Sequence, residues 1–242
     1  MRGSGKGGSN TRGQTPTTPS DLVAAYGGRV SAALSSDLAS AKSGEIFKWF
    51  LAAILFGGRI SDTLAMRAYR EFIRDGLTTP ERILARGWEG LVSALDRGGY
   101  VRYDFKTATK LLGINQTLLD RYAGDLNVLH GTATDPGDVE SRIKSLEKGI
   151  GDVTVNIFLK ELRGVWPKAT PTPSELVLMA AKRLNFIPPE MFDKDKALAL
   201  LVEQWRAEGN SLDDFRDFEA ALLRYGLDCK KREFRRRRKR RQ

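Results

Sequence analysis

Two glycines flank a single aliphatic residue in the segment LEKGIGDVTVNIFLKEL, residues 146–162. Gly149 and Gly151 let the backbone turn tightly around Ile150, because glycine adopts positive φ without a Cβ clash. An apolar helix end precedes the turn and an amphipathic pattern follows it. The first N–H groups of the second helix are therefore expected to face outward without partners, where they can bind an anion such as a nucleic-acid phosphate. An ordinary corner between helices, with glycine as a C-cap, is the alternative.

A second group able to bind anions is the C-terminal segment KKREFRRRRKRRQ, residues 230–242. It holds ten basic residues and one acid, whereas residues 20–229 carry 27 basic and 29 acidic side chains. Because like charges repel one another, we expect this segment to be disordered and to bind polyanions without reading their sequence. Its candidate DNA-binding residues are Arg235, Arg236, Arg237 and Arg238. A role in solubility or localisation, such as nuclear import, is the alternative.

The elements that position these groups are predicted to be helices. Apolar residues recur with helical spacing from about residue 20 onward, and no run alternates as a long strand would. We therefore expect an all-α fold. Capping hydroxyls or prolines mark several helix starts, as in Ser61-Asp62 and Thr79-Pro80-Glu81. The predicted helices span 20–40, 45–56, 61–75, 80–86, 88–96, 104–112, 115–126, 136–147, 152–163, 173–185, 193–208 and 211–227.

Composition narrows the class of protein further. The chain has 242 residues, a net charge of +10 and 41% hydrophobic residues. Its longest apolar run, residues 47–56, is too short to span a bilayer and is predicted to be a buried helix. Residues 1–19 are rich in Gly, Ser and Thr, lack a secretory signal, and are expected to be disordered. With Cys229 as the single cysteine, we expect an intracellular location: the cytoplasm or nucleoid, or the nucleus in a eukaryote.

Motifs for metal and nucleotide chemistry are missing from the sequence. His130 is the single histidine, so histidine-based metal sites and Ser-His-Asp triads have no support. The chain contains neither a phosphate-binding P-loop nor a dinucleotide fingerprint. We therefore expect neither a cofactor nor a metal ion.

The glycine turn resembles the helix-hairpin-helix element found in many DNA-repair proteins. The apolar, glycine and threonine positions of that element are filled by Leu146, Gly149, Ile150, Gly151, Thr154 and Val155. The wider sequence, over residues 45–229, resembles the endonuclease III-like branch of the helix-hairpin-helix (HhH-GPD) DNA glycosylases. Segments similar to the family's helices follow in the family's order at 50–73, 79–112, 166–186 and 218–232.

This resemblance implies a two-lobed helical domain over residues 20–229 with double-stranded DNA in its cleft. Lys148, the Gly149–Gly151 turn and Thr154 would contact phosphates, and neighbouring loops would help to rotate a damaged base out of the helix. Arg59 falls where the family has a polar residue that fills the vacated space, although an ordinary surface arginine is the alternative. We expect the protein to bind as a monomer.

The sequence departs from the family where catalysis would occur. The family's aspartate falls at Pro171 or Thr172, and the lysine of its strand-cleaving members falls at Val153; none of these residues carries a charge. Glu175 lies close enough along the chain to be a candidate carboxylate, although a capping role beside Thr172 or Ser174 fits it better. Of the family's four iron–sulfur cysteines only Cys229 is present, and one thiolate cannot hold a cluster.

A further departure concerns the hairpin itself. Asp152 opens the helix that follows the turn, where a carboxylate satisfies the helix N-terminus and repels phosphate. Lys144 and Lys148 are expected to offset this charge in part. Tyr100, Tyr103 and Phe105 can stack on a base, although core packing is the favoured interpretation for all three.

Three functions are consistent with these features. The first is a DNA-binding relative of the glycosylases that recognises a lesion or DNA structure but has lost catalysis. The second is an active monofunctional DNA N-glycosylase, without lyase activity, that uses Glu175, Asp104 or Asp138 as its carboxylate. The third is a helical module that binds RNA or protein, in which the hairpin match is accidental.

Overall fold

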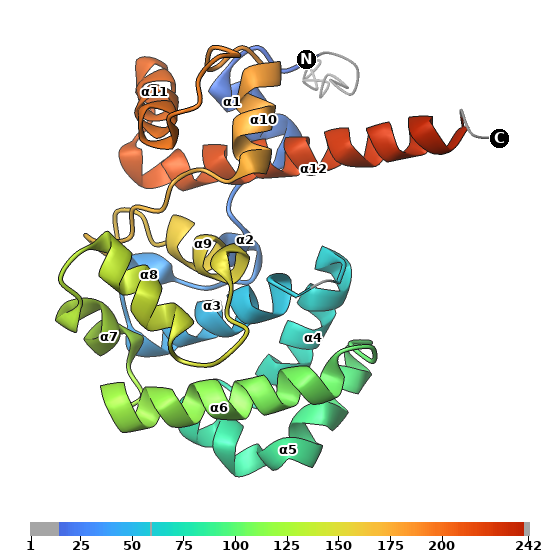
Figure 1. Cartoon of the computed structure of the whole chain (residues 1–242), viewed down its shortest axis with the longest axis vertical. Helices are drawn as coiled ribbons and strands as arrows, with labels where there is room; N and C mark the ends of the chain where they lie inside the picture. The colour runs from blue at the N-terminus through green and yellow to red at the C-terminus, as the bar shows by residue number, and fades with distance from the viewer. Residues whose placement is uncertain (1–14, 59, 240–242) are drawn as a thin grey trace, which may run out of the picture. The chain divides into compact units, whose positions relative to one another are not determined.

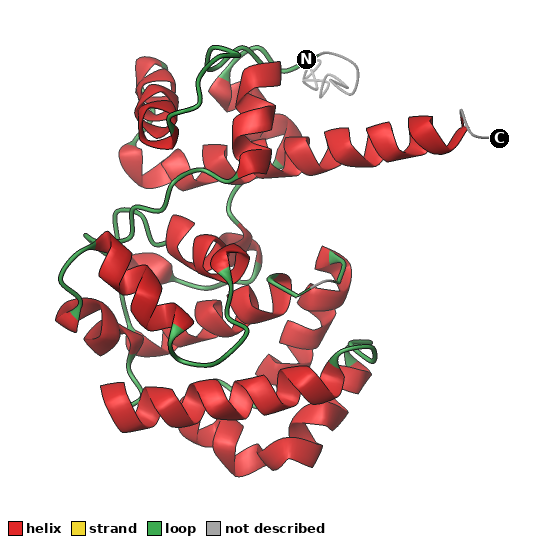
Figure 2. Ribbon diagram, in the orientation of Figure 1, coloured by secondary structure: helices red, strands yellow, loops and turns green. Residues whose placement is uncertain are grey.

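The computed structural model describes residues 15–58 and 60–239, which fold into helices connected by loops, with no strand among them (Figure 1). Figure 2 shows the helices in red and the loops in green. The prediction of an all-α fold is confirmed. The described chain divides into two compact units. Residues 30–171 form one, here called the hairpin unit, and residues 15–29 together with 172–239 form the other, here called the terminal unit.

The hairpin unit is built around α3 (Ser43–Phe56), whose residues Ile46 to Leu55 are buried except for Lys48. Trp49 is fully buried, and its indole N–H donates to the carbonyl of Phe158 at 3.0 Å. This outcome confirms the prediction of a buried helix over residues 47–56. Among the described residues, no helix is both long enough and apolar enough to cross a bilayer. The other helices of this unit are α2 (Val30–Ala33), α4 (Asp62–Arg74), α5 (Pro80–Arg97), α6 (Asp104–Tyr122), α7 (Leu126–Thr132), α8 (Pro136–Lys144) and α9 (Asp152–Lys160), with a 3₁₀ turn at Leu38–Ser40.

The helix α6 is continuous where a break was expected at Gly113. A Cβ on Gly113 would lie 1.9 Å from a carboxylate oxygen of Glu147. This glycine therefore accommodates the Glu147 side chain and does not end a helix. By contrast, the predicted division of residues 80–96 is confirmed. Gly87 has φ 70° and ψ 172°, and it separates two helical segments within α5.

The terminal unit joins both ends of the described chain. It contains α1 (Pro19–Tyr26), α10 (Glu175–Arg183), α11 (Lys194–Ala207), a 3₁₀ turn at Leu212–Asp214 and α12 (Phe215–Lys239). Phe218 lies at the centre of its core, 5.6 Å from the ring of Trp205 and 5.4 Å from that of Phe186. A Cβ on Gly226 would lie 2.7 Å from the carbonyl oxygen of Leu176, so α12 packs closely against α10 at this glycine.

The single helix predicted over 20–40 is wrong. In the structure α1 ends at Tyr26, and Gly27 follows with φ 76°. Asp217 accepts hydrogen bonds from the backbone N–H of Arg29 at 2.7 Å and from its guanidinium. These contacts with α12 hold residues 27–29 in a non-helical path that the helical spacing of the sequence does not reveal.

Both terminal segments that were expected to be disordered are described only in part. Residues 1–14 and 240–242 lie outside the described residues, and α1 begins at Pro19 with Thr18 as its N-cap. Residues 230–239 were expected to be disordered but continue α12. Arginine and lysine are good helix formers, and positive charge is favourable near a helix C-terminus. The ion pair between Arg183 and Glu233 also ties this segment to α10.

Candidate nucleic-acid interface

The glycine corner at residues 145–151 joins α8 to α9. Gly149 has φ 94°, a conformation that an L side chain rarely adopts, so the turn requires glycine here. Leu146, Ile150 and Val155 are 1%, 6% and 2% exposed and anchor the corner in the core, whereas Gly149 and Gly151 are exposed. The apolar positions therefore face inward and the glycines face solvent.

The first turn of α9 is open to a ligand. Gly151 is the N-cap residue, and no side chain caps the helix. A Cβ added to Gly151 would meet no atom within 4 Å apart from its chain neighbours, so the space beside this residue is open. Backbone N–H groups at an uncapped helix start, combined with the helix dipole, favour an anion at this position.

Helix α6 supports the corner. The ammonium group of Lys110 donates to the carbonyl of Gly149 at 3.1 Å. Burial and the nearby charge of Lys106 lower the pKa of Lys110. Figure 1 shows the loop between α8 and α9 running along α6. Lys106 and Lys110 therefore add positive charge near the corner, which no local pattern in the sequence indicates because 39 residues separate Lys110 from Gly149.

The charges on the corner itself are mixed. Lys144 lies 2.6 Å from the carboxylate of Asp152, which lowers the pKa of Asp152 and raises that of Lys144. This ion pair offsets the acid at the start of α9. Lys148 is exposed, and its backbone N–H donates to the side chain of Glu147 at 2.9 Å.

The two remaining hairpin positions face opposite ways. Val153 is 65% exposed and has no nucleophilic atom to offer. Thr154 was expected to contact phosphate, but it is 7% exposed. A Cβ on Gly57, at the end of α3, would lie 2.1 Å from the hydroxyl oxygen of Thr154. In this structure Thr154 therefore packs α9 against α3 rather than facing solvent.

Glu175 lies in the first turn of α10, in the terminal unit. Its side chain is 80% exposed and lies 2.7 Å from the ammonium group of Lys194, which lowers the pKa of Glu175. Ser174 is the N-cap of α10 and accepts from the backbone N–H of Val177. Of the two expected caps, Thr172 and Ser174, it is Ser174 that caps α10. An exposed, ion-paired carboxylate remains charged at neutral pH and lacks the apolar surroundings that raise the pKa of a general acid.

Of the other carboxylates considered from the sequence, Asp138 is held by structural contacts, whereas Asp104 adjoins a second carboxylate, that of Asp96. Asp104 is 8% exposed at the start of α6; burial and Asp104 together raise the pKa of Asp96. Asp138 accepts from the backbone N–H of Thr134 at 2.8 Å and from Arg142 at 2.9 Å. Arg59, the expected wedge, lies outside the described residues.

The basic residues Arg235 to Arg238 lie on the last turns of α12, and all four are exposed. Arg232 pairs with Asp228 four residues earlier, at 2.8 Å. The end of this helix is therefore strongly positive, as the composition predicts. Its basic residues are helical, however, and not disordered as expected.

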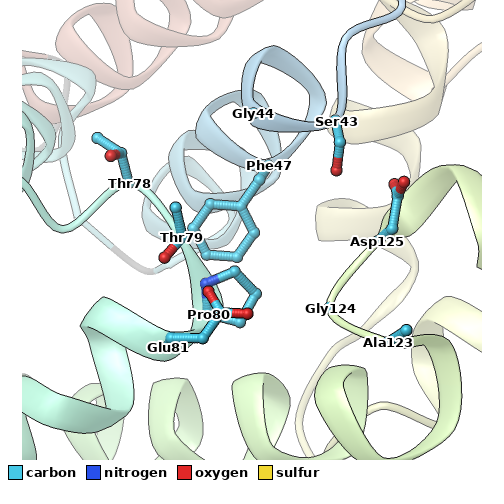
Figure 3. Close-up of a pocket in the computed structure, with 10 residues that line it drawn as sticks. All are labelled: Ser43, Gly44, Phe47, Thr78, Thr79, Pro80, Glu81, Ala123, Gly124 and Asp125. Atoms are coloured by element: carbon cyan, nitrogen blue, oxygen red, sulfur yellow. The ribbon is translucent and has the colours of Figure 1, made fainter.

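A pocket in the hairpin unit is lined by the starts of three helices: Ser43 and Gly44 of α3, Thr79 to Glu81 at α5, and Asp125 at α7 (Figure 3). Thr79 and Asp125 already accept from backbone N–H groups as N-caps. These two side chains therefore serve the helix starts. No group of three or more His, Cys, Asp or Glu side chains in the described ranges could hold a metal ion.

The aromatic residues of the middle region divide between core and surface. Tyr100 is 3% exposed, which confirms core packing for this residue, but Phe105 is 59% exposed, so core packing is wrong for it. His130 lies in α7 and stacks on Trp166, with ring centroids 4.6 Å apart.

No protein-family model matches the chain, and no curated protein matches it.

Proposed function

We propose that this protein binds double-stranded DNA through the glycine corner, as a member of the HhH-GPD glycosylase type that has lost catalysis. The observation that carries this proposal is the combination of an uncapped, solvent-facing start of α9 with apolar anchors on either side of the turn. In the free protein such amide groups are left to water, and a phosphate oxygen can replace that water. The division of the described chain into two helical units is compatible with the two-lobed fold of that type.

Charge near the corner supports the same proposal. Lys106, Lys110 and Lys148 lie on or beside it, and Lys144 neutralises Asp152. The exposed arginines at the end of α12 would add affinity that does not depend on DNA sequence. Together these groups would compensate for the acid that opens α9.

The proposed loss of catalysis rests on the residues at the expected catalytic positions. Val153 is an exposed alkane, and neither Pro171 nor Thr172 carries a charge. Glu175 is exposed and paired with Lys194, which suits a surface ion pair better than a group that stabilises an electron-poor sugar.

The test is duplex binding by the Gly151→Ala variant, measured by fluorescence anisotropy. Gly151 has φ −103°, which alanine tolerates, and its Cβ would occupy the empty space where a phosphate approaches. We expect about tenfold weaker binding, equivalent to roughly one charge-assisted hydrogen bond, with unchanged stability. Gly131→Ala is the control, because its Cβ also meets nothing within 4 Å but lies in α7. Equal affinities for the two variants would contradict the proposal.

The catalytic part is tested with duplexes that carry uracil, an alkylated purine, 8-oxoguanine or an oxidised pyrimidine. We expect binding without base release. Base release that disappears in the Glu175→Gln variant would establish an active monofunctional glycosylase instead. Nucleic-acid binding that disappears completely when residues 230–242 are deleted would favour the accidental match and the RNA- or protein-binding module.

A further inference from the structure

The surface where α5 meets α6 carries two aromatic rings in contact with each other. Trp88 of α5 is 39% exposed and Phe105 of α6 is 59% exposed, and their ring centroids lie 5.1 Å apart at an interplanar angle of 43°. Among the ring pairs of the described residues, this is the pair with both members exposed. Adjoining apolar side chains that stay open to solvent are typical of binding surfaces.

Hydrogen bonds hold the Trp88 ring in place. The indole N–H donates to the hydroxyl oxygen of Thr109 at 3.0 Å, and that hydroxyl donates to the carbonyl of Phe105 at 2.9 Å. The polar edge of the indole is thereby satisfied within the protein, while part of the ring stays open to solvent. A fixed ring of this kind can stack on a planar ligand at a small entropic cost.

Positive charge lies beside Phe105, in the turn before α6 and on α6 itself. Arg102 and Lys106 are exposed and flank Phe105 in the sequence, and Lys110 follows one turn after Lys106. Arg102 lies in the turn before α6, with its guanidinium 5.3 Å from the ring centroid of Tyr103. Lys106 and Lys110 are four helical residues apart, about 6 Å along the axis, and form a short basic row. The row ends at the glycine corner, because Lys110 donates to the carbonyl of Gly149. Acids also adjoin this surface: Glu89 follows Trp88, Asp96 interacts with Asp104 at the start of α6, and Glu147 interacts with Lys110.

From this arrangement we propose that Trp88 and Phe105 form a stacking platform for an unpaired base, beside the DNA duplex held at the glycine corner. The inference rests on the proposed function and narrows its substrate to DNA in which a single-stranded or melted segment adjoins a duplex. The aromatic faces accept any base, and Arg102, Lys106 and Lys110 neutralise the phosphates of the same strand.

The first test uses the intrinsic fluorescence of the full chain. Of the four tryptophans, Trp49, Trp166 and Trp205 are 0%, 3% and 5% exposed, so Trp88 is the one that a ligand can reach. We expect DNA with a short central bubble of unpaired thymines to quench tryptophan emission. A fully paired duplex of the same length should quench it much less. The same quenching by both DNAs, or by neither, would overturn the inference.

The second test compares variants on the same two DNAs, at about 0.15 M salt to screen long-range attraction to the basic helix end. We expect Trp88→Ala and Phe105→Ala each to weaken bubble binding about tenfold and to leave duplex binding unchanged. Trp88→Phe should lose less, because it keeps a ring. Phe192→Ala is the matched control, since Phe192 is 82% exposed but belongs to the terminal unit.

The outcomes separate this inference from the proposed function. If duplex binding depends on Gly151 but bubbles are not preferred, the platform is wrong and the proposed function stands. If duplex binding ignores Gly151 while bubble binding depends on Trp88, the glycine corner is wrong as the duplex site, but the stacking of an unpaired base on Trp88 stands. If Trp88→Ala instead abolishes self-association of the chain, seen by analytical ultracentrifugation, the ring pair is a contact between copies and the platform is wrong.

Discussion

The ammonium group of Lys144 lies 2.6 Å from the carboxylate of Asp152, so an ion pair joins the last turn of α8 to the first turn of α9 across the glycine corner. The carboxylate is 91% exposed and lies at the helix start that a phosphate would approach. Surface ion pairs contribute little to stability, so the main consequence of this pair is electrostatic. It keeps Lys144 paired and cancels the charge of Asp152.

Replacing Asp152 with asparagine should therefore strengthen DNA binding. The change removes a repulsive charge and frees Lys144 for a phosphate contact. We expect severalfold tighter duplex binding, and a plot of log affinity against log salt that is steeper by about one unit. Asp195→Asn is the control, because Asp195 is an exposed acid in the first turn of α11. Weaker binding by Asp152→Asn would mean that the acid holds the corner in its binding shape.

The packing of α9 on α3 should depend on the space between Gly57 and Thr154. Gly57→Ala places a methyl group 2.1 Å from the hydroxyl oxygen of Thr154, and the forced shift should cost about 1–3 kcal/mol. Adding Thr154→Ala should recover part of this loss, whereas adding Thr154→Val should not, because valine keeps the branched side chain. Urea unfolding of the three variants measures these differences. Equal recovery by alanine and valine would show that the hydroxyl position is not the obstacle.

The basic end of α12 should control the salt dependence of binding. Deleting residues 230–242 removes ten basic residues, and the salt slope should fall by about 0.9 for each phosphate that the shortened chain no longer neutralises. The affinity that remains should still respond to Gly151→Ala. Replacing Arg235 to Arg238 with glutamine keeps residues that favour a helix and should reproduce most of the loss. Retained affinity in the glutamine variant would indicate that the helix, rather than its charge, makes the contact.

The terminal unit should lose stability in acid through Asp217. Burial alone would raise the pKa of Asp217, but the hydrogen bonds from Arg29 outweigh it and lower the pKa below its ordinary value. A carboxyl whose pKa is lower in the folded state stabilises the fold above the unfolded pKa of about 3.9, and this contribution disappears as the pH falls through the folded pKa.

The Asp217→Asn variant tests this dependence. It should be less stable than the parent by about 1–2 kcal/mol at pH 7. The difference should begin to shrink as the pH falls below the unfolded pKa of about 3.9, and it should disappear as the pH falls through the lower folded pKa. Asp214→Asn is the matched control, since Asp214 also pairs with Arg29 but is 56% exposed. A stability difference that stays constant from pH 7 to pH 3 would rule out this role for the Asp217 charge.

Local contacts explain why much of the helical framework was predictable. Ser61 and Thr79 accept from backbone N–H groups three residues later, at 3.3 and 3.4 Å, where helix starts were predicted. The kink at Gly87 and the buried run of α3 were likewise visible as a glycine and an apolar segment. The start predicted near Pro173 falls slightly later, because Ser174 caps α10.

The helical class, most helix starts and the glycine corner follow from the order of the residues alone, because each depends on neighbours a few positions apart. Other features arise only from the packing of distant segments. A Cβ on Gly113, in the middle of α6, would clash with the side chain of Glu147. Lys110 contacts Gly149 across 39 residues. Trp88 and Phe105 meet only because α5 and α6 pack side by side. Close approach between distant residues follows from how helix faces fit together, and helical periodicity carries no information about that fit.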